Sequence, residues 1–355
     1  MKAKKLSALL LAVVMIFSLA ACGSKTPKTD PNATRIFTDS TGREVEVPAQ
    51  IDKVALSGPL AQIVLFALCP DKLVGVSNAW SSEAQEFLDE KYFNMPQIGQ
   101  LYGGKGELNL ETLLQSGAQV VIDVGESKGS IKEDMDYLQQ QTGIPFVHIS
   151  ADMQSYPQAY RMLGNLLGMK TEAEALATYC EKIYSRTETI ASGVEKANVL
   201  YVTGDMGQNV IAKGSYHAEI LDMLTNNLAQ VDEPSSKGTG NEVSMEQILT
   251  WNPDVVIFAP ESIYATVKDD AAWQSVTAIK NGAYYEVPFG PYNWMGFPPS
   301  VQRYLGMVWL SKLLYPDATA DYDLFADVQE YYKLFYHCDI TRAQYDALVA
   351  NSIGK

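Results

Sequence analysis

The sequence predicts an α/β protein with two Rossmann-like lobes joined by one long α-helix, and with a ligand cleft between the lobes. Three observations predict this fold. Short apolar strands alternate with amphipathic helices, the middle of the chain holds one uninterrupted helical segment, and the sequences on either side of that segment repeat each other. The chain of 355 residues is also long enough for two domains of ordinary size, each with its own core.

The central helix is expected to run from Lys170 to Ser192, a stretch without glycine or proline. Its small and apolar residues recur with i, i+3, i+4, i+7 spacing, so one face is expected to be buried along the whole length. At 1.5 Å per residue the helix spans about 33 Å, roughly the diameter of a domain. Thr171 with Glu174 three residues later has the pattern of a capping box at its start, and Gly193 follows as a stop.

The repeat consists of residues 109–122, NLETLLQSGAQVVI, and residues 244–257, SMEQILTWNPDVVI. Each segment opens with a residue suited to a helix N-cap, Asn109 or Ser244, continues as a short amphipathic helix and enters an apolar strand. Glutamates match at one constant offset, within the segments and in the loops that follow them: Glu111 with Glu246, and Glu126 with Glu261.

The first 21 residues read as a lipoprotein signal peptide. Lys2, Lys4 and Lys5 precede an apolar run that is too short for a comfortable membrane span, and small residues then lead to Cys22. This is the pattern of a bacterial lipobox, in which the cysteine is lipidated and becomes the mature N-terminus. Residues 22–34 are polar and contain proline, so they are expected to form a flexible tether.

The rest of the chain divides into an N-terminal lobe at residues 35–155, connector helices at 156–193 and a C-terminal lobe at 194–355. The N-terminal lobe is expected to hold a hairpin at 36–47, strands at 54–57, 73–76, 120–124 and 145–150, and a helix at 132–141. The C-terminal lobe is expected to hold strands at 198–203, 209–212, 254–259 and 283–287, short helices at 217–224 and 245–251, and terminal helices at 299–314, 327–335 and 342–350. This alternation favours mostly parallel sheets covered by helices.

Composition excludes several classes of function. The formal net charge of −15 argues against binding nucleic acid or an anionic lipid surface through bulk charge. The three histidines, His148, His217 and His337, share no metal-ligand spacing, and His148 lies in an apolar strand, where a structural role is expected. No P-loop or complete dinucleotide fingerprint is present. We therefore expect no cofactor, no resident metal and no enzyme.

Cysteine usage does not suggest a disulfide scaffold. Beside Cys22 the chain holds Cys69, Cys180 and Cys338, an odd number without C-x-x-C spacing. Cys180 falls on the expected buried face of the central helix, where it is interpreted as a small apolar filler.

In open parallel sheets, ligands bind beyond the carboxyl ends of the strands. The loops at these ends are rich in Trp, Tyr, Gly and Asn, as expected for an aromatic-lined pocket with a few polar anchors. The candidate ligand-binding residues in these loops are Trp80, Tyr102, Glu126, Lys128, Tyr216, His217, Glu261, Tyr292 and Trp294.

Together, the lipobox, the hairpin IFTDSTGREVEVP, the paired segments and the central helix resemble the helical-backbone (class III) substrate-binding lipoproteins of ABC importers, of the iron–siderophore and cobalamin type. The resemblance covers nearly all of residues 35–348. It implies a monomer, lipid-anchored on the extracytoplasmic face of the cell membrane, that delivers a ligand to a membrane permease without catalysis. It also implies that one acidic residue on each lobe docks on the permease, and Glu111 and Glu246 stand at the matching positions. Both also lie where glutamate stabilises the positive end of a helix dipole.

The resemblance favours an iron complex, a ferric siderophore or a haem-like chelate, as the ligand. The chain departs from the arginine cluster expected for anionic siderophores, because no arginine lies in the expected cleft loops; the available cations are Lys105, Lys128 and Lys213. Two alternatives within the family are a corrinoid and a molybdate-type oxyanion held by backbone N–H groups at helix N-termini. An alternative from another class is a cell-surface enzyme that uses Glu126 and Glu261 as an acid–base pair across the cleft.

Overall fold

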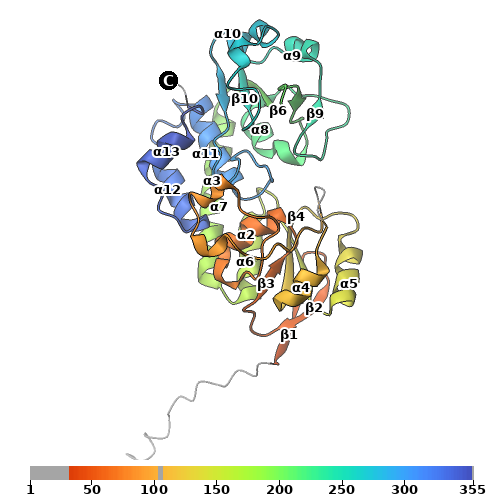
Figure 1. Ribbon diagram of the computed structural model, residues 1–355. Helices are drawn as coiled ribbons and strands as arrows, with labels where there is room; N and C mark the ends of the chain where they lie inside the picture. The colour runs from red at the N-terminus through yellow and green to blue at the C-terminus, as the bar shows by residue number, and fades with distance from the viewer. Residues whose placement is uncertain (1–31, 103–106, 354–355) are drawn as a thin grey trace, which may run out of the picture.

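The structure of the protein, a computed structural model, describes residues 32–102 and 107–353. Two lobes face each other across the middle of the molecule, and a layer of helices runs along one side of both (Figure 1). The predicted signal peptide, Cys22, most of the tether and Lys105 lie outside the described residues. The predicted fold class, two α/β lobes joined by one long helix, is confirmed.

The N-terminal lobe is built on a parallel sheet of order β3-β4-β5, formed by β3 (Val54–Leu56), β4 (Val120–Gly125) and β5 (Phe146–Ser150). The predicted hairpin is present as β1 (Thr34–Thr38) paired antiparallel with β2 (Glu44–Pro48). The strand predicted at 73–76 is reduced to isolated bridges from Leu73 to Val54 and from Val76 to Gln97. The helices of this lobe are α2 (Pro59–Leu68), α3 (Ser82–Gln85), α4 (Leu110–Ser116) and α5 (Ile131–Thr142).

The C-terminal lobe is built on a mixed sheet of order β11-β10-β6-β7-β9, with β8 (Asn226–Asn227) paired to β6. Its parallel part consists of β6 (Asn198–Thr203), β10 (Val255–Phe258) and β11 (Tyr284–Glu286). The short strands β7 (Asn209–Val210) and β9 (Asn241–Glu242) extend it antiparallel. The helices of this lobe are α8 (Glu219–Leu224), α9 (Met245–Trp251) and α10 (Thr277–Lys280).

The connector is one continuous helix of 24 residues, α7 (Lys170–Gly193), which packs against α6 (Tyr156–Leu167). Its buried face follows the predicted spacing and holds Ala173, Leu176, Ala177, Tyr179, Cys180, Ile183, Thr187 and Ile190.

The predicted capping box at the start of this helix is wrong. Because α6 ends at Gly168 in the left-handed conformation, the chain turns straight into α7, and the N-cap is Met169 without a side-chain bond. Glu174 instead pairs with Arg161 of α6 at 2.7 Å.

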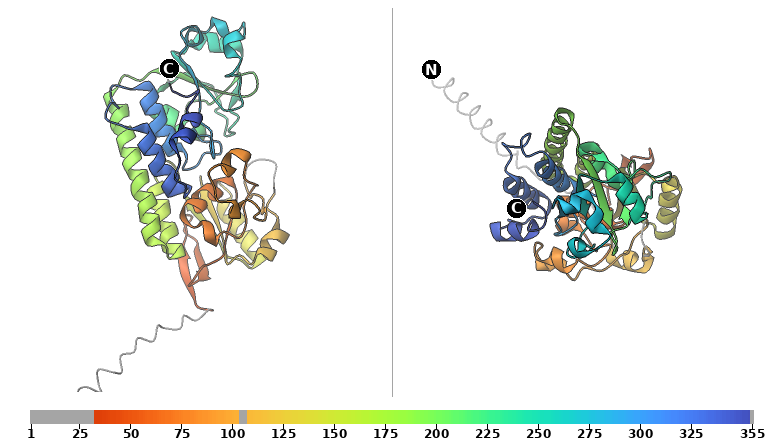
Figure 2. Two further views of the ribbon diagram at one scale, coloured as in Figure 1. Left: turned by 60° about the vertical axis from the view of Figure 1, so that its left-hand side comes forward. Right: turned by 90° about the horizontal axis from the view of Figure 1, so that it is seen from above.

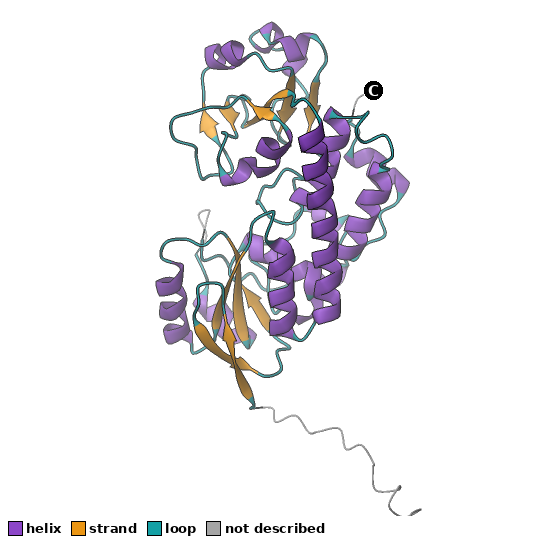
Figure 3. Ribbon diagram, turned by 180° about the vertical axis from the view of Figure 1, so that it is seen from behind, coloured by secondary structure: helices purple, strands orange, loops and turns teal. Residues whose placement is uncertain are grey.

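The C-terminal helices belong to the same layer as α7. Figure 2 shows α11 (Arg303–Leu314) and α12 (Leu324–Phe335) alongside α7, and the view from behind shows the layer spanning both lobes (Figure 3). Tyr331 and Phe335 of α12 stack at 4.2 Å, and Tyr179 of α7 meets the Tyr331 ring edge-on at 5.8 Å. Helix α12 also packs against α2 of the N-terminal lobe, and α13 (Arg342–Leu348) packs against α12. One hydrophobic core therefore runs from the first lobe through α7 to the end of the chain.

Cys69, Cys180 and Cys338 are free thiols, and the first two are buried. Burial raises the pKa of the Cys69 thiol to about 12, so it is protonated at neutral pH. Within residues 32–102 and 107–353, no helix combines the length and the apolar composition needed to cross a bilayer.

The contact between α6 and α7 generates a stability prediction. A Cβ atom added at Gly164 would lie 2.5 Å from the Ala173 Cβ and 3.1 Å from the Met169 carbonyl oxygen. Gly164→Val should therefore lower the free energy of unfolding by about 1–3 kcal/mol, the usual cost of overpacking, as measured by urea denaturation. At Gly193 of the same helix pair nothing lies within 4 Å, so the control Gly193→Ala should be neutral or stabilising by up to about 1 kcal/mol. Equal stability of Gly164→Val and the wild type would contradict this packing.

Candidate functional site

The loops that follow the N-terminal strands meet the C-terminal part of the chain. The Tyr216 hydroxyl donates to the carbonyl oxygen of Ala151, directly after β5, at 3.1 Å. The Tyr304 hydroxyl donates to the carbonyl oxygen of Met153 at 2.6 Å. The carboxyl ends of these parallel strands therefore open onto the region between the lobes, as expected for a ligand site in such sheets.

A buried arginine occupies this region. Arg303, the first residue of α11, is 0% exposed. Its Nη1 donates to the Tyr216 carbonyl oxygen at 2.9 Å and lies 2.5 Å from a carboxylate oxygen of Glu219, and the guanidinium lies 4.7 Å from the centre of the Tyr216 ring. Its Nε and Nη2 have no hydrogen-bond partner among the described residues.

The groups around the guanidinium are mostly buried as well. Tyr156, the first residue of α6, is 0% exposed, and its hydroxyl has no partner in the described part of the chain. Burial raises the pKa of Tyr156, and the charge of Arg303 opposes the rise. Burial also raises the pKa of Glu219, again opposed by Arg303. We call Arg303, Tyr156, Tyr216 and Glu219 the guanidinium cluster.

The helices that start at these strand ends have no side-chain caps. Helices α2, α5 and α6 follow β3, β4 and β5, and none of them, nor α11, receives a side-chain cap; their N-cap residues are Gly58, Ser130, Ser155 and Gln302. By contrast, Asn109 caps α4 and Ser244 caps α9. Backbone carbonyls accept several of the first-turn N–H groups, among them those of Arg303 and Tyr304 in α11, Tyr156 in α6 and Ile131 in α5. The positive ends of the helix dipoles at the strand ends still favour an anion.

Two of the predicted ligand-binding residues, Tyr216 and His217, lie at this cluster. Tyr216 belongs to it, and His217 is 8% exposed beside it. Burial lowers the pKa of His217, with further lowering from the charges of Arg303 and Lys128. Lys128 is in the N-terminal lobe and His217 in the C-terminal lobe, so this electrostatic effect acts between the lobes.

The two glutamates proposed as an acid–base pair are not brought into contact. Both are exposed, and Glu126 pairs with its neighbour Lys128 at 2.7 Å. Glu261 has a positive φ of 65° in the loop after β10. No hydrogen bond or ion pair joins Glu126 to Glu261 in the described residues.

The two predicted tryptophans lie in the core, contrary to the expectation that they line the pocket. Trp80 is 5% exposed, and its Nε1 donates to the Tyr92 carbonyl oxygen at 3.0 Å. Trp294 is 0% exposed, and its Nε1 donates to the Gly290 carbonyl oxygen at 3.4 Å. Each indole has its polar atom satisfied by nearby backbone, so we assign both rings to packing.

The remaining predicted tyrosines are half-buried. The Tyr292 hydroxyl accepts a hydrogen bond from the Gln62 amide of α2 at 3.4 Å, so it links the two parts of the chain. The Tyr102 hydroxyl donates to the Asp134 carboxylate of α5 at 2.6 Å. Neither belongs to the guanidinium cluster.

The predicted docking residues occupy equivalent positions. Glu111 and Glu246 are exposed second residues of α4 and α9, after side-chain caps that bond Thr112 N at 2.9 Å and Gln247 N at 3.2 Å. Helix α4 lies on the N-terminal lobe and α9 near the far end of the C-terminal lobe (Figure 1). Neither glutamate contacts the guanidinium cluster.

Sequence reasoning missed Arg303 and a polar row at the end of the first sheet. The row consists of Ser57, Asp123, His148, Ser127 and Ser150. In the strand register Asp123 stands opposite His148, whose Nδ1 lies 2.6 Å from the Asp123 carboxylate, and Ser57 donates to the same carboxylate. The sequence did contain a hint of this row, because polar residues occur near the carboxyl ends of three otherwise apolar strands.

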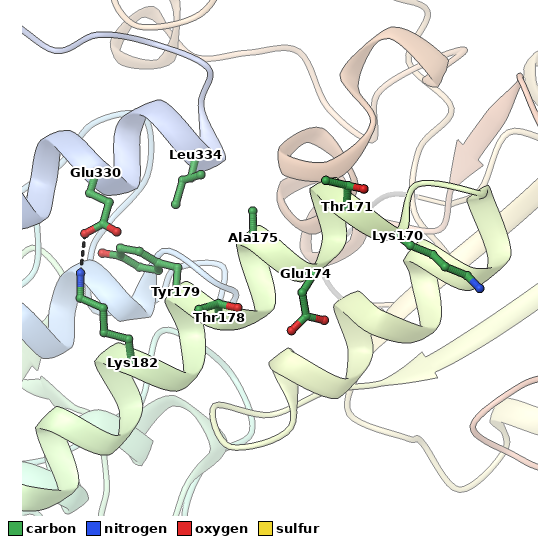
Figure 4. A pocket seen from close by; sticks show the side chains of 9 residues that line it. All are labelled: Lys170, Thr171, Glu174, Ala175, Thr178, Tyr179, Lys182, Glu330 and Leu334. Atoms are coloured by element: carbon green, nitrogen blue, oxygen red, sulfur yellow. Dashed lines mark hydrogen bonds and ion pairs between the residues drawn. The ribbon is translucent and has the colours of Figure 1, made fainter.

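A surface groove between α7 and α12, with a volume of about 790 Å³, lies outside this region (Figure 4). No strand-end loop contributes to it, and Lys182 and Glu330 pair across it at 2.6 Å. We do not assign it a ligand. The described residues also contain no group of three or more His, Cys, Asp or Glu side chains that could hold a metal ion.

Comparison with known proteins gives one consistent family. The family model described as periplasmic binding protein matches residues 54–290. The molybdate-binding protein MolA of Haemophilus influenzae is 25% identical over 349 residues, which cover 90% of this chain and 95% of that protein.

Solved structures agree with this similarity. An ABC transporter solute binding protein from Sulfurospirillum deleyianum aligns with a TM-score of 0.81 and 26% identity, covering 89% of this chain and 99% of that one. Molybdate-bound MolA from Haemophilus influenzae aligns with a TM-score of 0.68 and 20% identity, covering 86% of this chain and 99% of that one. At that identity the second likeness shows the fold alone.

The environment of His217 predicts a pH effect on stability. Its pKa in the folded protein lies below the usual value of 6.5, so the folded state binds this proton less tightly than the unfolded state. This contribution to stability is fully present above about pH 6.5 and is lost as the pH falls below it. NMR titration of the imidazole should give a midpoint below 6.5, and His217→Gln should remove this part of the pH dependence of urea unfolding. A midpoint at or above 6.5 would contradict the burial described here.

Proposed function

This chain belongs to the periplasmic binding protein family, and from that premise we propose that it captures a small oxyanion of the molybdate type outside the cytoplasm and delivers it to an ABC permease. The proteins to which it is similar are solute-binding proteins rather than enzymes. The ligand is the new element of the proposal, and it rests on the chemistry of the guanidinium cluster.

The proposal of an oxyanion rests mainly on two nitrogens of Arg303 that have no partner among the described residues. Nε and Nη2 lie along one edge of the guanidinium, the edge that can hold two oxygens of one anion in a bidentate contact. Burying a charged donor without an acceptor costs about 1–3 kcal/mol or more, so this edge needs oxygen ligands. A tetrahedral oxyanion supplies two of them at suitable spacing.

The surroundings favour hydrogen bonding over net charge. Glu219 offsets the charge of Arg303, so the cluster is close to neutral. The Tyr156 hydroxyl adds a donor without adding a full charge, and the positive dipole ends of α6 and α11 favour an anion. Such donors suit a small anion that accepts hydrogen bonds on every side.

The iron-complex reading loses much of its support at this site. A large planar or hydrophobic chelate would need exposed aromatic rings, and Trp80 and Trp294 are instead packed in the core. The same argument applies to a corrinoid. The relative from Haemophilus influenzae, which is named for molybdate binding, supports the oxyanion.

We also propose that the mature protein is a monomer held at the outer face of the cell membrane by a lipid on Cys22. The support is the sequence pattern of residues 1–22, since small residues precede the cysteine after a basic and apolar leader. Metabolic labelling with a fatty acid tests it, because Cys22→Ser should abolish incorporation.

The ligand assignment makes a binding prediction. Titration calorimetry should show that the purified protein binds molybdate, and that Arg303→Gln weakens binding at least 100-fold, about 3 kcal/mol, because the charged bidentate contact is lost. Arg303→Lys should fall between, since the charge stays and the fork is lost. Thermal unfolding checks that each variant folds. The matched control is Arg342→Gln, an exposed arginine paired with Asp346, which should bind normally. Binding of a ferric siderophore, haem or cobalamin in place of every oxyanion tested would overturn the assignment.

The docking assignment predicts a separation of binding from uptake. Glu111→Lys and Glu246→Lys should leave ligand affinity unchanged, lower the free energy of unfolding by about 1 kcal/mol through the helix dipole, and sharply reduce uptake by cells. The matched control is Glu172→Lys, because Glu172 is an exposed first-turn glutamate of α7. It should show the same dipole cost with normal uptake. If the first two variants fold, bind and support normal uptake, the docking role is wrong and the dipole alone explains these glutamates.

A further inference from the structure

The loop between β4 and α5 carries a motif that binding does not explain. Residues 125–129 read Gly-Glu-Ser-Lys-Gly, a G-x-S-x-G sequence. Strand β4 ends at Gly125, and helix α5 begins at Ile131. A serine in this sequence, between a strand and a helix, is the usual setting of a nucleophile in hydrolases with a parallel sheet.

Ser127 has the partners that a nucleophile needs. Its Oγ lies 3.0 Å from His148 Nε2, and His148 Nδ1 lies 2.6 Å from the Asp123 carboxylate. Both distances fall within hydrogen-bond reach, as required for a nucleophile, a general base and a group that orients the base.

The three side chains differ in solvent exposure as a catalytic site requires, with an accessible nucleophile and a buried base. His148 is 0% exposed and Asp123 is 8% exposed, whereas Ser127 is open to solvent. The buried hydrogen bond between Asp123 and His148 is held by the cross-strand register, and the serine is presented at the surface of the lobe.

The hydrogen-bond pattern fixes the proton positions. Asp123 also accepts a hydrogen bond from Ser57, so its carboxylate acts as an acceptor toward both neighbours. In neutral His148 the proton is therefore on Nδ1, and Nε2 is free to accept a proton. Ser150 Oγ lies 3.1 Å from Nε2 and 2.6 Å from Ser127 Oγ, so it is the one other hydroxyl at this nitrogen among the described residues.

Donors for a developing oxyanion are also at hand. In such hydrolases the backbone N–H of the residue after the nucleophile serves this purpose. Here that residue is Lys128, and no acceptor within the described chain takes its N–H or that of Gly129. The N-terminus of α5, which follows directly, has no side-chain cap.

This arrangement shares no side chain with the guanidinium cluster, although Ser150 is followed by Ala151, whose carbonyl oxygen accepts from Tyr216 of the cluster. Side chains alternate between the two faces of a strand. On β5, Phe146 packs with the helix α5 side of the lobe, so His148 and Ser150 share that face, whereas Val147 and Ile149 belong to the main core. Tyr156 of the guanidinium cluster also belongs to the main core.

We propose that Ser127, His148 and Asp123 form a second site that hydrolyses carboxylic esters. Ser127 Oγ attacks the acyl carbon while its proton passes to His148 Nε2. The ester C–O bond breaks, and the alcohol leaves with that proton. Water then attacks the acyl carbon and gives one proton to His148. The acyl C–Oγ bond breaks, His148 returns the proton to Ser127 Oγ, and the carboxylic acid leaves. Ester and water give acid and alcohol, with no other reactant. Ser127 and His148 are the catalytic residues, and Asp123 is a positioning residue.

The test uses the purified soluble chain and two probes. A fluorophosphonate should form one covalent adduct per chain, which peptide mapping by mass spectrometry places on Ser127. p-Nitrophenyl acetate should be turned over repeatedly, with kcat/KM reduced at least 100-fold in Ser127→Ala. The matched control is Ser192→Ala, an exposed serine at the end of α7, which should react like the wild type.

The positioning role and the binding function are tested separately. Asp123→Asn should lower kcat and shift the pH profile of hydrolysis, because the histidine loses the carboxylate that orients its tautomer. Ser127→Ala should bind molybdate like the wild type, so failure of one site leaves the other assignment standing. No adduct on Ser127, an adduct on Ser150 instead, or equal turnover in Ser127→Ala overturns the proposal.

Discussion

The fold depends on one continuous apolar contact, the buried face of α7. A helix of 24 residues exposes its other side to water, and the buried side packs against α6, α11 and α12 along its length. Because these partners come from both halves of the chain, the two lobes share a core rather than a flexible linker. Bending α7 would break backbone hydrogen bonds and open this core, so the relative position of the lobes is restrained at a single, stiff element.

That restraint lets polar groups persist where the lobes meet. The start of α11, the Tyr216 ring and Tyr156 shield Arg303 from water, and Glu219 is its ion-pair partner. On the other side of the first sheet, Asp123 and His148 are buried as a hydrogen-bonded pair between neighbouring strands. Both arrangements are costly without a rigid frame, because buried charges are stable only while their partners stay in place.

Much of the fold was predictable because its signals are local. The strands follow short apolar runs, the helices follow a 3.6-residue period, and Asn109 and Ser244 cap the helices where the sequence repeat places them. The helix α7 begins at Lys170 as predicted, but its capping box was mispredicted because the left-handed Gly168 sets the turn before Thr171. The site was harder, since an aromatic residue in a loop has the same local signature whether it faces a ligand or the core. For that reason Trp80 and Trp294 were predicted to line the pocket, whereas both rings pack in the core. The roles of Arg303, Asp123 and His148 could not be predicted, because their partners are set by strand register and by helices distant in sequence.

The end of the chain has a consequence for how the protein is made. Tyr332 of α12 packs edge-on against Phe87, and His337 Nε2 bonds the Phe66 carbonyl oxygen of α2. The ribosome therefore has to complete almost the whole polypeptide before the first lobe obtains its last covering side chains. Early segments stay incompletely packed during synthesis, which delays stable folding until the final helices emerge. A polypeptide that folds in this order stays sufficiently unfolded to pass through a narrow secretion channel until its last helices are in place.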